Sequence, residues 1–109
     1  MAYFLMRCLH HPDQDAQRDK LRADHRGWVG SGGQGLVSVL IGAALQNENG
    51  AANGNFGILQ AKTSQDARRF AEGDPFALAG IVRLIEITPL PDGFQAGRIT
   101  EPMSPLLDL

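Results

Sequence analysis

Apolar and polar positions along the chain predict a strand, a helix, two strands, a helix and a last strand. Residues 2–9 are a short run of aromatic and large apolar side chains, typical of a buried strand. Residues 13–29 predict an amphipathic helix, because Leu21, His25 and Trp28 recur at the i, i+4, i+7 spacing of one helix face. Residues 36–46 predict a strand with two apolar faces, in which the odd-numbered positions 37–45 form one continuous apolar face.

Turn and capping signals separate the remaining elements. Two Asn-Gly pairs between residues 47 and 54 predict a hairpin, with residues 55–62 as the returning strand and a loop long enough to flank a cleft. Thr63 begins the second helix in the manner of a capping box. Gly73 ends that helix, and Pro75 holds Asp74 in an extended conformation, where Asp74 can cap a new short turn. Residues 81–88 predict the last strand.

This order of elements predicts an α+β fold of the ferredoxin-like, split βαβ kind (βαββαβ), with a four-stranded antiparallel sheet and both helices on one face. Two helices cover one side of a sheet, so the other side would expose an apolar patch that includes Leu36 and Leu40. A homodimer that packs sheet on sheet is the simplest cover. We expect one domain at residues 1–91, with residues 92–109 either disordered or packed on the partner chain; in a monomer this tail would have to cover the patch.

Composition narrows the classes of function. The chain has 109 residues, 43% of them hydrophobic and 20% charged, and a net charge of −2, which is typical of a soluble globular domain and argues against nucleic-acid binding. The single Cys8 fits a reducing compartment. No apolar run is long enough to cross a membrane, and the first residues lack the pattern of a signal peptide. We therefore expect a cytoplasmic protein.

Three local patterns resemble functional sites. His10 and His11 have no further ligands at metal-binding spacing, so solvated loop histidines are favoured over a metal site, and no cofactor is expected. The glycine-rich segment 30–35 has the letters G-x-G-x-x-G, but it follows a helix instead of a strand, which excludes the nucleotide-binding motif. Arg18, Arg22 and Arg26 form a stripe at i+4 spacing, interpreted as a solvated face, with an anionic ligand or partner as the alternative.

Taken alone, Asp74 and His25 have a structural interpretation, in which Asp74 caps a turn and His25 is a satisfied core histidine. The opening Ala-Tyr-Phe-Leu-Met-Arg, the segment Asp24-His25-Arg26, and Asp74-Pro75-Phe76 followed by Ala79-Gly80-Ile81 resemble the YCII-related (YciI-like) proteins over residues 3–89. The resemblance implies a dimeric α+β barrel and a His–Asp pair, which would be His25 and Asp74. Some relatives remove chloride from ring compounds in the degradation of chlorinated aromatics. Positions 42–43 and 54–55 depart from the family pattern, so the substrate is not inherited.

The resulting hypothesis is a lyase or isomerase in which Asp74 orients His25 for general acid/base chemistry on a ring-derived catabolic intermediate. Arg7 is a candidate for holding a substrate anion, and Trp28 and Phe76 are candidates for an apolar wall of the substrate site. The expected partners are a second copy of the chain and a small ligand, with an anion as one possibility. The alternatives are a ligand-binding homodimer without turnover and a structural homodimeric domain.

Overall fold

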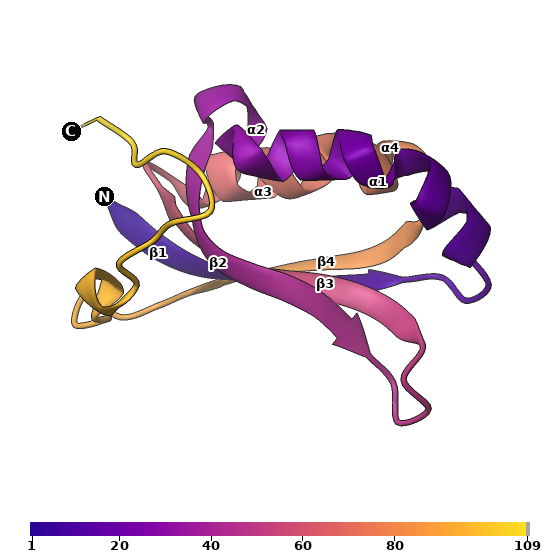
Figure 1. Ribbon diagram of the computed structural model, residues 1–109. Helices are drawn as coiled ribbons and strands as arrows, with labels where there is room; N and C mark the ends of the chain where they lie inside the picture. Colours follow the sequence, from indigo (N-terminus) through magenta and orange to yellow (C-terminus); the bar gives the residue numbers. More distant parts are fainter. Residues whose placement is uncertain (109) are drawn as a thin grey trace.

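The computed structural model describes residues 1–108 as a four-stranded sheet with helices on one face (Figure 1). The sheet is antiparallel throughout, with strand order β2-β3-β1-β4. The predicted α+β, βαββαβ fold is confirmed. In chain order the elements are β1 (Ala2–His10), α1 (Asp15–Gly30), α2 (Gly32–Gly35), β2 (Val37–Gln46), β3 (Ala52–Ala61), α3 (Ser64–Gly73), α4 (Pro75–Leu78), β4 (Val82–Pro89) and the 3-10 turn η1 (Ala96–Arg98).

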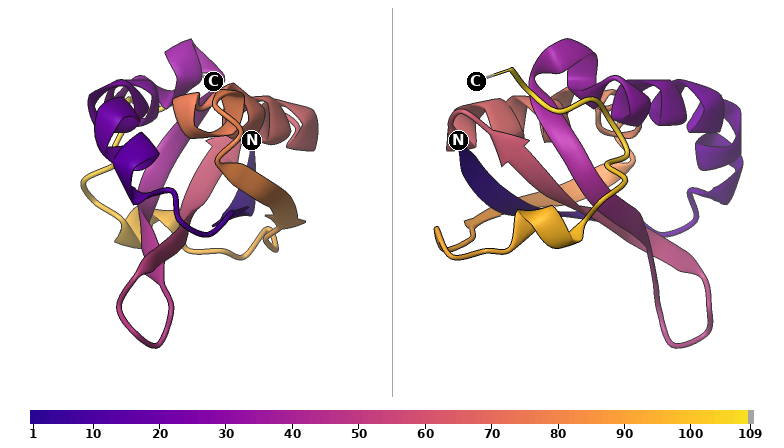
Figure 2. Two further views of the ribbon diagram at one scale, coloured as in Figure 1. Left: turned by 90° about the vertical axis from the view of Figure 1, so that its right-hand side faces the viewer. Right: turned by 60° about the vertical axis from the view of Figure 1, so that its left-hand side comes forward.

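The hydrophobic core lies between the sheet and α3. Alternate residues of β1 point toward the helices, because side chains along a strand alternate between its two faces. From α3, three apolar side chains are buried, and Leu59 and Ala61 of β3 are fully buried opposite them. Helix α1 lies beside α3 and α4 on the same face of the sheet (Figure 2). It packs chiefly against α2 and α4, and it meets the core near its C-terminal end through Trp28 and Val29. The members of the core are Phe4, Met6, Cys8, Val37, Val39, Leu59, Ala61, Ala67, Phe70 and Ala71.

Both predicted helix caps near the second helix are confirmed. The Thr63 side chain accepts a hydrogen bond from the backbone N–H of Asp66 at 3.1 Å, which starts α3. Asp74 has extended backbone angles, and its Oδ1 accepts from the backbone N–H of Phe76 at 2.8 Å, which starts α4 at Pro75. The Thr63 cap fixes the start of α3, and the Asp74 cap fixes the corner after it, so the Asp74 carboxylate has a defined position.

The expectation of one continuous apolar face along β2 is wrong, because a bulge interrupts the strand. Val39 pairs with Leu59, but Ile41 pairs with the next residue, Ile58, so the register shifts around Leu40. An extra residue in one strand moves every later side chain to the opposite face. Val37 and Val39 are therefore buried under the helices, whereas Ile41 is 45% exposed on the outer face. The sequence could not indicate the bulge, since both faces of the run are apolar.

The glycine-rich segment after α1 forms the tight turn α2. Gly33 has a φ of 63°, and a Cβ there would lie 2.8 Å from Phe70 and 2.9 Å from Trp28. A side chain at Gly32 would meet the carbonyl oxygen of Val37 at 2.0 Å. The glycines allow the chain to turn from α1 into β2 at close quarters.

The C-terminal tail packs on its own chain. The backbone N–H groups of Met103 and Ser104 donate to the carbonyl of Val39, and Ser104 Oγ accepts from the N–H of Val39 at 2.6 Å. Phe94 lies against Tyr3 at the outer face, with ring centroids 5.4 Å apart. In this single chain the tail thus lies against Tyr3 at one end of the outer face and reaches the edge of β2 at Val39, whereas its packing on a partner chain stays a prediction. Within residues 1–108, no helix combines the length and apolar character needed to cross a membrane.

Candidate active site

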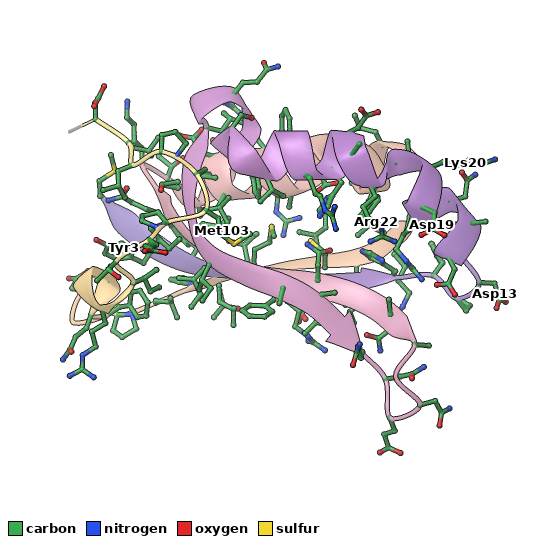
Figure 3. All side chains as sticks on the ribbon, viewed as in Figure 1. Tyr3, Asp13, Asp19, Lys20, Arg22 and Met103 are labelled. Carbon is green, nitrogen blue, oxygen red and sulfur yellow. The ribbon has the colours of Figure 1, made fainter. Side chains whose placement is uncertain are left out.

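A cavity of about 840 Å³ lies between α1 and the β2–β3 part of the sheet. Figure 3 shows side chains of α1, including Arg22, reaching toward this region. Small residues of β2 and β3 form its floor, α1 forms its roof with charged side chains, and apolar side chains complete its walls. The floor residues are Gly42, Ala43, Ala44, Ala52, Gly54, Gly57 and the backbone of Phe56; those of the roof are Asp15, Arg18, Asp19, Arg22, His25 and Arg26; the walls include Met6, Val39, Phe70, Phe76 and Met103.

His25 of α1 and Asp74 at the start of α4 are hydrogen-bonded. Nδ1 of the imidazole lies 2.7 Å from Oδ2 and 2.9 Å from Oδ1 of the carboxylate. Both side chains are largely buried, at 18% and 9% exposure. The structure thus brings together the two residues that the sequence placed 49 positions apart.

The surroundings of the pair hold both side chains in place. Asp74 Oδ1 also accepts from the Phe76 backbone N–H, so the carboxylate cannot rotate freely. The His25 ring stacks on Phe76 with centroids 4.2 Å apart and planes 9° apart. Because the carboxylate accepts at Nδ1, a neutral His25 carries its proton on Nδ1 and its lone pair on Nε2. His25 lines the cavity, and Nε2 has no hydrogen-bond partner in residues 1–108.

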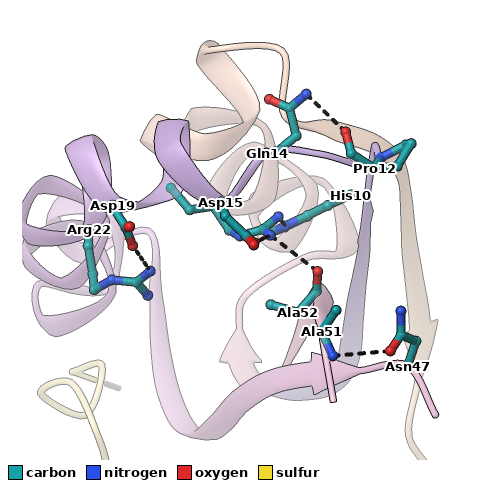
Figure 4. Close-up of polar contacts among 10 residues, drawn as sticks. His10, Pro12, Gln14, Asp15, Asp19, Arg22, Asn47, Ala51 and Ala52 are labelled. Atoms are coloured by element: carbon teal, nitrogen blue, oxygen red, sulfur yellow. Dashed lines mark hydrogen bonds and ion pairs between the residues drawn. The ribbon is translucent and has the colours of Figure 1, made fainter. Parts of the chain in front are cut away.

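A second polar group lines the cavity, formed by His10, Arg18 and Asn55. Figure 4 shows His10 of this group with Asp15 of α1 and Ala52 of β3 close to it. Arg18 Nη1 lies 3.2 Å from His10 Nδ1, and His10 Nε2 lies 3.1 Å from Asn55 Oδ1. Arg18 also donates to the carboxylate of Asp15 and, at 3.2 Å, to the carbonyl of Ala52. The pKa of His10 lies below its usual value, mainly because the ring is buried and to a smaller extent because Arg18 is positively charged. The hydrogen bond to Asn55 acts in the opposite direction and raises the pKa.

The interpretation of His10 as a solvated loop histidine is wrong. His10 is the last residue of β1 and is only 5% exposed. It continues the alternation of Phe4, Met6 and Cys8, which all point toward the helices. This even-numbered pattern was present in the sequence and could have identified His10 as an inward-facing residue. Asn55 had no sequence signal beyond its position in a predicted strand.

Of the three residues considered for substrate contacts, only Phe76 lines the cavity. Arg7 lies on the outer face of the sheet, where it forms an exposed ion pair with Glu86 of β4. The Trp28 ring packs against Gly33 and Gly73, and its Nε1 donates to the carbonyl of Phe70 at 3.0 Å. In this chain Arg7 is therefore away from the cavity and Trp28 supports the junction of α1 with α3.

The arginine stripe of α1 faces the cavity. Arg18 is buried, and Arg22 pairs with Asp19 at 2.8 Å while keeping 44% of its side chain exposed. Arg26 has no ion-pair partner within residues 1–108. With three arginines and two aspartates, the roof carries an excess of positive charge. The positions of these side chains are thus compatible with the alternative interpretation of the stripe, in which the arginines attract an anionic ligand or partner.

Other reactive groups lie outside this arrangement. Cys8 is buried in the core, and burial is the main reason that its pKa is raised to about 12. A thiol of that kind is not a nucleophile at neutral pH. Across the described chain, 1–108, no three His, Cys, Asp or Glu side chains are grouped so that they could hold a metal ion.

The fold and the cavity define a small ferredoxin-like α+β domain with a hydrogen-bonded histidine and aspartate beside a space of ligand size. The chain belongs to the YCII-related domain family, whose model matches residues 1–91. Its structure is similar to that of 5-chloro-2-hydroxyhydroquinone dehydrochlorinase (TftG) from Burkholderia phenoliruptrix AC1100 in complex with 2,5-dihydroxybenzoquinone. The TM-score is 0.70 at 20% sequence identity, covering 84% of this chain and 95% of that one. Among curated proteins, none matches this chain.

Proposed function

We propose that this chain is a small-molecule enzyme of the lyase or isomerase type that uses His25 and Asp74 for general acid/base chemistry. The observation that carries the proposal is the 2.7 Å hydrogen bond between His25 Nδ1 and Asp74 Oδ2 at the wall of the cavity. A carboxylate on Nδ1 sets the tautomer of the ring and stabilises the imidazolium form. His25 Nε2 is then the atom that takes a proton from the substrate and returns it.

In the lyase version, His25 Nε2 removes a proton from a ring carbon or hydroxyl group of the substrate. The electron pair left behind moves into the ring system, and a leaving group on a neighbouring carbon departs with the electrons of its bond. In the isomerase version, His25 returns the proton to a different atom. General acid/base catalysis of this kind contributes about 10²–10⁴ in rate.

We further propose a flat, ring-derived and negatively polarised substrate. The cavity combines aromatic and methionine walls with arginines on α1, a combination that suits a ring with oxygen substituents. The likeness to a dehydrochlorinase bound to 2,5-dihydroxybenzoquinone supports this choice of ligand class. Arg22 and Arg26, and not Arg7, are the residues that we expect to attract a substrate anion.

A homodimer is part of the proposal. The outer face of the sheet exposes Ile41 and Leu84, at 45% and 42%, with Ile58 and Leu45 beside them on β3 and β2. Apolar residues that share an exposed sheet face are typical of an interface between chains. A second copy packed on this face would give the dimeric α+β barrel that the family resemblance implies. A cytoplasmic location stays a prediction that rests on the single, buried Cys8.

The test is turnover of chlorinated, hydroxylated rings, beginning with 5-chloro-2-hydroxyhydroquinone, followed as chloride release. We expect His25→Ala to lower kcat/KM by about 10²–10⁴. The control is His11→Ala, which changes an exposed histidine outside the cavity and should leave kcat/KM unchanged. Unaltered turnover in His25→Ala would refute the role of the pair. Binding of 2,5-dihydroxybenzoquinone without turnover of any ring in the panel would favour the alternative, a ligand-binding homodimer.

A further inference from the structure

The second polar group of the cavity contacts Phe76, the same ring that packs against His25. The Phe76 ring stacks on His25 and meets His10 edge-on, with centroids 4.2 Å and 5.7 Å apart. His10 comes from β1, Arg18 from α1 and Asn55 from β3, so three elements converge on this point. The proposed acid/base chemistry does not use any of these three side chains.

The donors and acceptors of this group are fixed by the chemistry of arginine. A guanidinium has only N–H donors, so His10 Nδ1, 3.2 Å from Arg18 Nη1, has to accept. The buried, neutral His10 ring therefore carries its proton on Nε2. That proton is donated to Asn55, so the side-chain atom of Asn55 at 3.1 Å is the carbonyl oxygen. The direction of both His10 hydrogen bonds thus follows from the fact that the Arg18 guanidinium can only donate.

This chain of hydrogen bonds leaves the amide nitrogen of Asn55 as its free end. Asn55 Nδ2 has no hydrogen-bond partner in the part of the chain that the structure describes, 1–108. Buried side-chain atoms without a partner in that range are Asn53 Oδ1 and Gln60 Oε1, and Asn55 Nδ2 is not one of them. Because Asn55 lines the cavity, its N–H groups are accessible from there.

We propose that Asn55 is a substrate-binding residue whose amide N–H donates to a carbonyl or phenolate oxygen of the ring substrate. This inference rests on the proposed function, since it names a contact of the same substrate. While His25 removes a proton, negative charge develops on ring oxygens, and a donor held in advance at that oxygen stabilises the charge. An aspartate or an inverted amide at position 55 would present an acceptor instead and would disfavour such a ligand.

Arg18 and His10 are positioning residues in this proposal. Arg18 has a side-chain exposure of 6%, and its bonds to Asp15 and to the Ala52 carbonyl hold it against His10. His10 in turn sets which end of the Asn55 amide faces the ligand. Removing the arginine would free His10 to adopt either tautomer and Asn55 to rotate.

The first experiment needs no ligand. In ¹⁵N-labelled protein at neutral pH, long-range ¹H–¹⁵N spectra of His10 should show a neutral ring with the proton on Nε2. Arg18→Met should produce a mixture of tautomers, and Arg18→Lys, which keeps a donor, should restore the Nε2–H form. A proton on Nδ1 or a cationic ring in the unsubstituted protein would overturn the proposal.

The second experiment compares the binding of 4-nitrophenolate with that of nitrobenzene, which lacks the ring oxygen. The unsubstituted chain should prefer 4-nitrophenolate, and Asn55→Leu should weaken 4-nitrophenolate about tenfold without changing nitrobenzene. The control is Asn53→Leu, an amide on the same strand that does not line the cavity, which should keep the preference. No preference in the unsubstituted chain, or an undiminished preference in Asn55→Leu, would overturn the proposal. If only the catalytic proposal fails, turnover is absent while the oxygen preference and the His10 tautomer remain.

Discussion

Helices α1 and α3 cover the same face of one sheet, yet they relate to it in opposite ways. Helix α3 buries Ala67, Phe70 and Ala71 against the strands, and the core lies beneath it. Helix α1 buries only Arg18 and packs chiefly on α2 and α4. The inward face of α3 is apolar, whereas that of α1 carries arginines and His25. A helix whose inner face is charged stands away from the sheet, and the space left is the cavity.

The strand beneath the two helices repeats the same contrast. Leu59 of β3 is fully buried in the core, while Gly57, two residues earlier on the same face, lines the cavity. Gly54 and, on β2, Gly42 and Ala44 continue the open floor. A strand can thus serve the core at one end and a ligand site at the other through the size of its side chains alone.

The largest effect should come from breaking the contact of α3 with the core. Phe70 is 1% exposed, so Phe70→Ala should lower the free energy of unfolding by about 3–5 kcal/mol. The matched change on α1, Leu21→Ala, removes a half-buried side chain and should cost about 1 kcal/mol or less. Urea denaturation of both variants measures the difference. Equal losses would mean that α1 contributes to the core as much as α3 does.

Closing the open end should affect ligand binding more than stability. A Cβ at Gly57 would meet Leu59 and Met6 at 3.4 Å, an ordinary contact distance, so Gly57→Leu can extend into the cavity. We expect the affinity for 2,5-dihydroxybenzoquinone to fall at least about tenfold, while the free energy of unfolding changes by about 1 kcal/mol or less. Titration and urea denaturation of the same sample measure the two quantities. Unchanged affinity would show that the ligand does not use this space.

The contrast between the helices also explains what the sequence could predict. The sequence predicts an element correctly where its local signals agree with burial in the fold. Examples are the Thr63 cap, the apolar stripe of α3 and the Asp74 corner. The pairing of His25 with Asp74 needed a family resemblance, because no local pattern links residues 49 positions apart. The bulge at Leu40 and the contact of Arg18 with His10 arise only when strands and helices pack, so periodicity could not reveal them.

The smallest predicted effect is the pH dependence of stability that comes from His10, and it tests whether this histidine is neutral in the folded chain. His10 faces Arg18 of α1 and Asn55 of β3, with Asp74 and His25 nearby, and its pKa is lowered mainly by burial. As the pH falls through about 6.5, the unfolded chain binds a proton at His10 and the folded chain does not. This group alone should therefore reduce the free energy of unfolding by at most about 1.4 kcal/mol per pH unit. His10→Gln cannot titrate, so the difference between the two unfolding curves from pH 7.5 to 5.5 isolates this contribution from that of the carboxylates. A difference that is flat over that range, or one in which the unsubstituted chain gains stability on acidification, would mean that His10 is protonated in the fold and that Arg18 does not hold it neutral.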